Sequence, residues 1–218
     1  MVVAKGGKEC NDNYRHECNN DLMAIPPANM NQLFDSSFSI NELAEIFDFY
    51  LVHTPIKRDE KAKDDKNRYL GDYGWKGGSE LSRLESKLLK ASGIPSFVIL
   101  KSSCIDSTLA AMRLTGEICP SCPRAVLKLN CKVRLKENGQ VSVVSFESRL
   151  ACVFRHIRNS IAHGQVFGLG NRMIYMFDKD DNGEKSAAMV INQRTLFNWI
   201  RIVDKDGRFY PARANAEE

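Results

Sequence analysis

The segment FRHIRNSIAHGQVFG, residues 154–168, gathers side chains that can take part in acid–base and phosphate chemistry. It holds two of the four histidines of the chain, His156 and His163, together with Arg155 and Arg158. Histidine can take up or release a proton near neutral pH, and arginine carries a permanent charge on a planar fork that matches phosphate oxygens. These residue types could therefore bind a phosphate group and move protons beside it.

A helix is expected to carry these side chains. Apolar residues recur at helical spacing from Leu150 to Ile161 and predict a helix over about residues 147–163. They form one stripe that must face a core, and both histidines fall on the polar face. At about 100° per residue, Arg158 and His163 lie about 140° apart, so they would not touch on one straight helix.

The same residues also fit a helix end without any chemistry. His163 precedes Gly164, and a histidine in the last turn followed by a glycine is a common way to end a helix. Arg158 could extend along the apolar stripe with its charge in water. An arginine five residues before a histidine also arises often by chance, so the spacing alone carries almost no information.

The wider context of the motif says more. The run from Arg158 to His163 within IRNSIAHG resembles the R-x4-6-H motif that members of the HEPN family carry at a helix end, in its common RN-x-x-AHG form. The resemblance extends over about 147–203, through RMIYMF, AAMVI and a closing helix. It implies a mainly α fold, a HEPN-like antiparallel helical bundle with two β-hairpin additions. It also implies a homodimer in which both copies of the motif meet in one cleft.

Many HEPN proteins are metal-independent endoribonucleases of toxin–antitoxin or anti-phage defence systems, and others are inactive modules that bind nucleic acid or a partner protein. The resemblance therefore implies RNA cleavage through attack by the ribose 2′-OH, without a cofactor. His163 would act as general acid or base, Arg158 would hold the phosphate, and Asn159 would orient the phosphate or the imidazole. Arg155 and His156 would contact the RNA backbone, although exposed polar positions explain that pair equally well. The expected partners are RNA, a second copy and an antitoxin or regulatory protein.

The rest of the chain divides into three parts by pattern. Residues 1–35 predict a loosely structured N-terminal arm, 36–204 the helical domain, and 205–218 a C-terminal tail. The domain contains a charged loop at 55–78 and β-hairpins near 126–146 and 172–191. Besides the helix over about 147–163, it is expected to contain four more: from the Ser39–Glu42 capping box to near His53, over SELSRLESKLLKAS, over about 103–116, and over QRTLFNWIRIV with Asn192 as N-cap.

Composition restricts the partners of the chain. Among 218 residues, 31 basic against 27 acidic side chains give a net charge of +4, which is milder than that of dedicated nucleic-acid binders. Any polyanion site must therefore be local. The basic strand face from Lys128 to Lys136 could be such a site in an antitoxin or a sensor, or simply a solvated sheet face. No apolar run reaches the roughly 18 residues of a membrane span, and the N-terminus lacks the pattern of a signal peptide, so we expect a cytoplasmic protein.

The seven cysteines are expected to be reduced thiols in that compartment. Cys119 and Cys122 form a C-x-x-C pair, which is half of a zinc site. Cys104 and Cys131 are the nearest further ligands, but there is no second C-x-x-C pair. We therefore predict no metal.

Overall fold

The computed structural model describes residues 22–24, 38–56, 68–101, 104–135, 141–145 and 147–211. Most of the predicted N-terminal arm, and residues 57–67 of the predicted charged loop, lie outside this range. No helix in the described part of the chain is long and apolar enough to cross a membrane.

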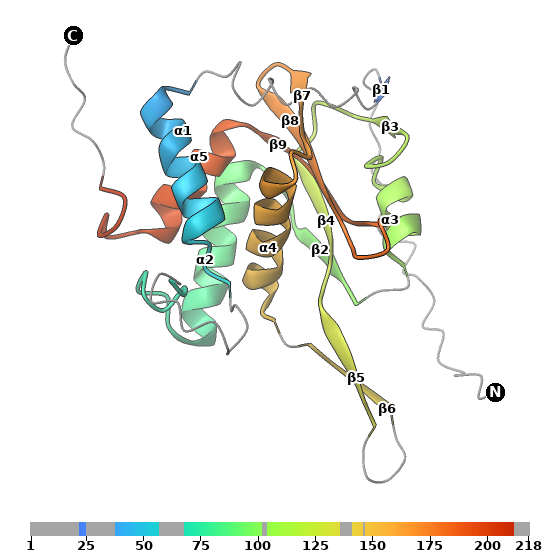
Figure 1. Ribbon diagram of the computed structural model, residues 1–218, viewed down its shortest axis with the longest axis horizontal. Coiled ribbons are helices and arrows are strands. Elements are labelled where there is room, and N and C mark those ends of the chain that lie inside the picture. The colour runs from blue at the N-terminus through green and yellow to red at the C-terminus, as the bar shows by residue number, and fades with distance from the viewer. Residues whose placement is uncertain are drawn as a thin grey trace.

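A mixed five-stranded sheet forms the centre of the molecule (Figure 1). Its strands follow the order β2 (Phe97–Leu100), β4 (Arg124–Lys128), β9 (Lys185–Asn192), β8 (Met173–Lys179) and β7 (Val166–Gly170). β2 and β4 are parallel, and every other neighbouring pair is antiparallel. Successive side chains of a strand point to opposite faces of a sheet, so this sheet contributes to two separate cores.

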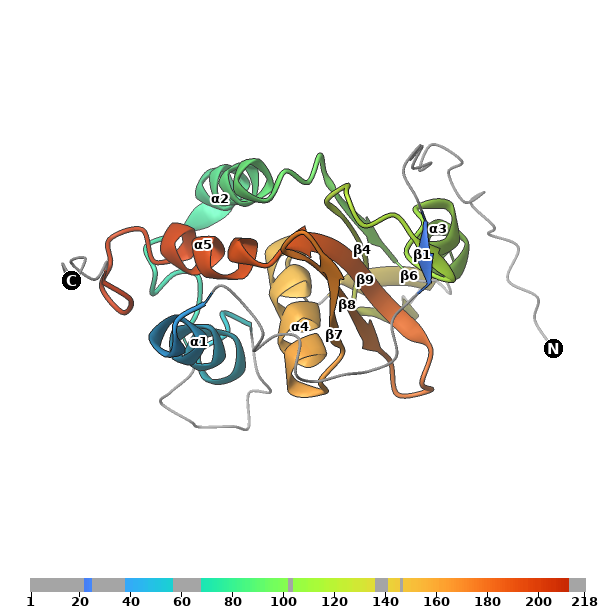
Figure 2. The ribbon, with the colours of Figure 1, turned by 90° about the horizontal axis from the view of Figure 1, so that it is seen from above.

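The larger core lies between the sheet and four helical segments (Figure 2). These are α1 (Ile40–Phe47) with its π-helical continuation η2 (Asp48–Val52), α2 (Gly77–Ser92), α4 (Arg149–Ala162) and α5 (Arg194–Val203). α4 packs directly on β8, and α1, α2 and α5 lie farther from β8 than α4 does.

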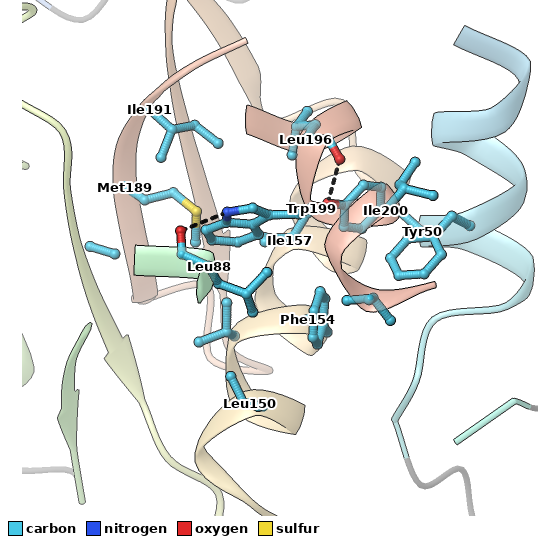
Figure 3. Close-up of a cluster of buried hydrophobic side chains, with 14 of the residues drawn as sticks. Tyr50, Leu88, Leu150, Phe154, Ile157, Met189, Ile191, Leu196, Trp199 and Ile200 are labelled. Atoms are coloured by element: carbon cyan, nitrogen blue, oxygen red, sulfur yellow. Dashed lines mark hydrogen bonds between the residues drawn. The ribbon is translucent and has the colours of Figure 1, made fainter. Parts of the chain in front are cut away.

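Trp199 of α5 occupies the middle of this core (Figure 3). It has no exposed surface, and its indole Nε1 donates to the carbonyl of Leu88 at 3.0 Å. Nearby, the Tyr50 hydroxyl donates to the carbonyl of Leu196 at 2.9 Å. Burying a large apolar side chain stabilises a fold by about 1.5–3 kcal/mol, and these polar atoms are buried without losing their hydrogen bonds. The core therefore joins α2 and α5 to the face of α4 that carries Phe154.

The smaller core lies on the opposite face of the sheet, under α3 (Ile105–Ala111). Arg124 of β4 is buried there, and its guanidinium donates to four carbonyls, those of Met112, Arg113, Cys119 and Cys122. Burial lowers the pKa of Arg124 to about 10. A short ladder, β1 (Met23–Ala24) with β3 (Glu117–Ile118), adjoins this core.

Two further strands form a hairpin that projects from the sheet (Figure 1). β5 (Cys131–Leu135) pairs with β6 (Val141–Ser145). Its base is fixed by Glu147, whose carboxylate accepts from the backbone N–H of Asn130 at 2.7 Å. The predicted turn at Asn138–Gly139 lies outside the described residues.

The prediction of a mainly α bundle is wrong, because the five-stranded sheet makes this an α/β fold. The hairpin expected at 172–191 is no addition: its strands β8 and β9 lie inside the sheet. β2 and β7 are not recognised from the sequence. β2 and β9 are buried on both faces and have no apolar–polar alternation, and β7 contains two glycines. The alternating run from residue 127 to 135 divides between β4 and β5.

Helix positions agree better with the patterns. The capping box of Ser39 and Glu42 is confirmed at the start of α1. α5 begins one residue later than expected, with Gln193 at the N-cap position, while the Asn192 side chain accepts from the N–H of Arg194. The first residues of the predicted tail pack on the core, since Tyr210 is buried and donates to Asp48 at 2.8 Å.

Candidate functional site at the end of the fourth helix

The motif residues lie on the last two turns of α4 and just beyond it. Ser148 caps the start of the helix by accepting from the N–H of Ala151. His163 is the C-cap residue, and Gly164 adopts the left-handed conformation with φ at 64°. A backbone bond from Gln165 to Ser160 then turns the chain into β7. The predicted helix end is therefore correct to within a residue.

A cluster of charged side chains is buried where α4 meets the sheet. Arg155 forms a two-bond ion pair with Glu147, with its Nε and Nη2 each 2.8 Å from a carboxylate oxygen. His156 has no exposed surface, and its Nδ1 lies 2.7 Å from Oδ2 of Asp178 on β8. Its Nε2 lies 2.9 Å from the carbonyl of Lys128 on β4. The cluster thus connects α4 to two strands and to the base of the hairpin.

The His156 ring lies between two oxygens of the sheet. Both of its nitrogens face oxygens, and a carbonyl oxygen can only accept. Arg155 Nη2 lies 3.1 Å from Nε2, but its two hydrogens are already directed to Glu147 and to the carbonyl of Lys128. The Lys128 carbonyl therefore accepts from Nε2 of the ring. Arg155 compensates the charge of the Glu147 carboxylate, which makes burial of that pair possible.

These contacts correct the expectation for Arg155 and His156. The sequence predicts that both are exposed, either in contact with RNA or simply solvated. His156 is instead fully buried, and the Arg155 side chain is 18% exposed with protein partners for its guanidinium. α4 is covered on two sides, by helices on one and by the sheet on the other, so its polar face is a second interface. We therefore assign the two residues to holding α4 in place.

Arg158 and Asn159 are brought together, and their contacts continue into the buried cluster. Arg158 Nη1 donates to Oδ1 of Asn159 at 3.1 Å, and Asn159 Nδ2 donates to Oδ2 of Asp178 at 3.1 Å. The Nε of Arg158 is buried without a hydrogen-bond partner. No carboxylate pairs with Arg158 within the described residues.

His163 lies apart from that pair. It is exposed, and its imidazole makes no hydrogen bond or ion pair with the described part of the chain. Arg158 bonds to Asn159 and not to His163, in keeping with the separation of Arg158 and His163 around the helix. The site thus has an anchored cation and a solvent-facing imidazole at one helix end.

Two carboxylates of the site are not found by reasoning from the motif. Asp178 ends the run MIYMFD of β8, where Ile174 and Met176 precede it on the same face. A carboxylate that alternates with apolar residues on the buried face of a strand is the signal that could have identified it. Glu147 stands immediately before the N-cap of α4 and has no comparable signal.

The cysteines also differ from expectation. Cys104 and Cys119 each take part in a disulfide, so the prediction of reduced thiols throughout is wrong. Cys122, Cys131 and Cys152 are free thiols. A sulfur in a disulfide is not a thiolate ligand, so this state of Cys119 does not supply half of a zinc site. In the described ranges, no three His, Cys, Asp or Glu side chains are grouped so that they could hold a metal ion.

No family model matches the chain, and no curated protein or solved structure matches it. The resemblance to HEPN proteins therefore remains a prediction from the motif, without a supporting fold.

Proposed function

We propose that the C-terminal end of α4 is a metal-independent endoribonuclease site. In this proposal Arg158 holds a phosphate of RNA, Asn159 orients Arg158, and His163 transfers a proton. The observation that carries the proposal is the state of Arg158, a half-buried guanidinium with no anionic partner in the described part of the chain and with a buried, unbonded Nε.

Other partly buried arginines of the fold support this interpretation. Arg155, Arg194 and Arg201 each pair with a carboxylate, from Glu147, Glu42 and Glu45 respectively. A guanidinium without an anion is costly when it is half-buried, and a phosphate bound at its accessible edge would supply the missing negative charge. Arg158 is thus arranged to receive an anion from outside the chain.

RNA supplies both an anion and a nucleophile. A base takes the proton of the ribose 2′-OH, the 2′-oxygen bonds to phosphorus, and the bond from phosphorus to the 5′-oxygen breaks as that oxygen receives a proton. The products are a 2′,3′-cyclic phosphate and a 5′-OH. The exposed imidazole of His163 can serve as base or acid, and the charge of Arg158 stabilises the pentacovalent phosphorus.

The reaction needs an acid and a base, whereas the described residues of one chain place a single exposed imidazole, that of His163, at this helix end. His156 is buried and bound on both nitrogens. A second copy related by a two-fold axis would bring a second His163 and a second Arg158 to one cleft. The proposed enzyme is therefore a homodimer. A role in toxin–antitoxin or anti-phage defence, with an antitoxin or regulatory partner, remains a prediction.

The test compares three chains on RNA in the presence of EDTA: wild type, His163→Ala and, as control, His53→Ala. His53 is the C-cap residue of η2 and lies far from His163 in the sequence. Its Nε2 lies 3.7 Å from Oδ1 of Asp48. We expect wild type and His53→Ala to cut RNA, and His163→Ala to fold but lose at least about a hundredfold in rate. Full activity of His163→Ala would refute the proposal. RNA binding that requires Arg158, without cleavage by any chain, would favour the alternative of an inactive binding module.

A further inference from the structure

Among the described residues, Asp178 is the carboxylate that hydrogen-bonds to the motif, and the proposed mechanism gives it no role. It lies on β8 with its side chain only 2% exposed. Its Oδ2 accepts from His156 at 2.7 Å and from Asn159 at 3.1 Å, and its Oδ1 accepts from the backbone N–H of Lys179 at 2.9 Å. Both oxygens are therefore occupied by donors.

We infer that Asp178 is a positioning residue that sets the direction of the Asn159 amide and, through it, the place of the Arg158 guanidinium. This inference rests on the proposed function of Arg158. A carboxylate can only accept, so Asn159 must present its NH₂ group to Asp178. Its carbonyl oxygen then faces Arg158, and that is the oxygen which receives Nη1 at 3.1 Å.

The His156 contact makes this arrangement rigid. Asp178 is held from one side by a buried ring that is itself fixed to the carbonyl of Lys128 at 2.9 Å. Arg158 makes no bond to any carboxylate in the described ranges, so Asn159 supplies its hydrogen-bonded anchor. Each side chain is thus positioned by the one nearer the sheet: His156 holds Asp178, Asp178 orients Asn159, and Asn159 anchors Arg158.

The substitution Asp178→Asn tests the direction of the amide. If its new NH₂ group replaces Oδ1, it faces the N–H of Lys179, donor against donor. If it replaces Oδ2, it faces the NH₂ of Asn159, which must turn over to accept. Asn159 would then present its own NH₂ to Arg158 and displace the guanidinium. Asp180→Asn is the matched control, because Asp180 lies two residues away and bonds to Lys128 Nζ at 2.9 Å.

The expected result is a fall of about 10–100-fold in kcat/KM for RNA with Asp178→Asn, and less than about twofold with Asp180→Asn. The decisive comparison is made in an Arg158→Ala background. There, Asp178→Asn should cause no further loss, because its effect passes through Arg158. A further tenfold loss in that background would overturn the inference, because it would show that Asp178 acts by a route that does not pass through Arg158.

Two measurements separate this inference from the proposed function. The side-chain amide protons of Asn159, observed by NMR, should exchange with solvent about tenfold faster in Asp178→Asn than in wild type or Asp180→Asn. Equal rates would overturn the inference, whether or not the protein cuts RNA. A wild-type chain without cleavage would instead refute the proposed function. If Asp178→Asn fails to fold, Asn159→Ala breaks the same connection while leaving the His156–Asp178 contact, and its loss should likewise vanish in the Arg158→Ala background.

Discussion

The ion pair between Glu147 and Arg155 offers a measurable test of the buried cluster. The Glu147 side chain is 10% exposed and accepts three hydrogen bonds, two from Arg155 at 2.8 Å and one from the N–H of Asn130 at 2.7 Å. In Glu147→Gln an NH₂ group replaces one of these oxygens, so a donor faces a donor in either orientation. Arg155 also keeps its charge, while its nearest remaining carboxylate, that of Asp178, lies 4.0 Å away.

The expected cost follows from burial. Removing one partner of a buried ion pair typically costs about 3–5 kcal/mol, because the other charge is left without compensation. A chain of this size loses about 2–4 °C in Tm for each kcal/mol, which gives a fall of about 6–20 °C. The hairpin base should loosen as well, since Asn130 loses its acceptor.

A second pair in the same fold provides the control. Glu85 likewise accepts from Nε and Nη2 of Arg149, here both at Oε1 at 3.2 and 2.9 Å, but the side chains are 20% and 52% exposed. Glu85→Gln should therefore cost about 0–1 kcal/mol. The measurement is denaturant unfolding of both variants with the disulfides intact. Costs that agree within about 0.5 kcal/mol would refute the reasoning that burial makes the Glu147 pair important.

Two further predictions rest on pKa values. Burial alone would raise the pKa of the Glu42 carboxyl, but hydrogen bonds from Ser39 and Arg194 lower it. A lowered pKa in the folded state stabilises the protein above pH 4.5, and this contribution is lost as the pH falls through the folded value. The stability difference between wild type and Glu42→Gln, measured by unfolding from pH 7 to pH 3, should therefore shrink; a constant difference would contradict it. Burial raises the pKa of the Cys152 thiol to about 12. Iodoacetamide at pH 8 should then label Cys122 in the folded protein and Cys152 only after unfolding, as peptide mass mapping would show; labelling of both at equal rates would contradict it.

Local patterns predict the helices of this chain because their signals lie within a few residues. Ser39 and Glu42 form their capping box across one turn, and Gly164 ends α4 directly after His163. The apolar stripe of α4 likewise predicts the face that carries Phe154. Each of these features depends on neighbours in sequence, so one chain is enough to find them.

The sheet and the buried cluster depend on contacts between distant residues. The β2 strand, Phe97–Leu100, pairs with β4, and β4 pairs with β9, which lies about sixty residues further along the chain. A strand buried on both faces has no alternation to reveal it. His156 appears solvent-facing on a helical wheel because the wheel assumes one buried side, whereas α4 has two. Only the tertiary fold shows that Asp178 of β8 lies opposite the second buried side of α4.

The candidate site could be predicted in part for the same reason. Arg158, Asn159 and His163 are close in sequence and form a recognisable motif. Their environment is not local, because the contact that anchors Asn159 comes from β8. The sequence therefore predicts which residues gather at the helix end, and the fold decides that Arg158 is held while His163 remains exposed.

The central claim is that this helix end cuts RNA by attack of the 2′-OH without a metal. The most direct measurement is mass spectrometry of the product ends after incubation of wild type with RNA in EDTA, beside the same RNA with a single 2′-deoxyribose at the cut position. The proposed mechanism predicts 2′,3′-cyclic phosphate and 5′-OH ends, and no cut at the deoxyribose. Cleavage at the deoxyribose, or 5′-phosphate ends, would contradict it.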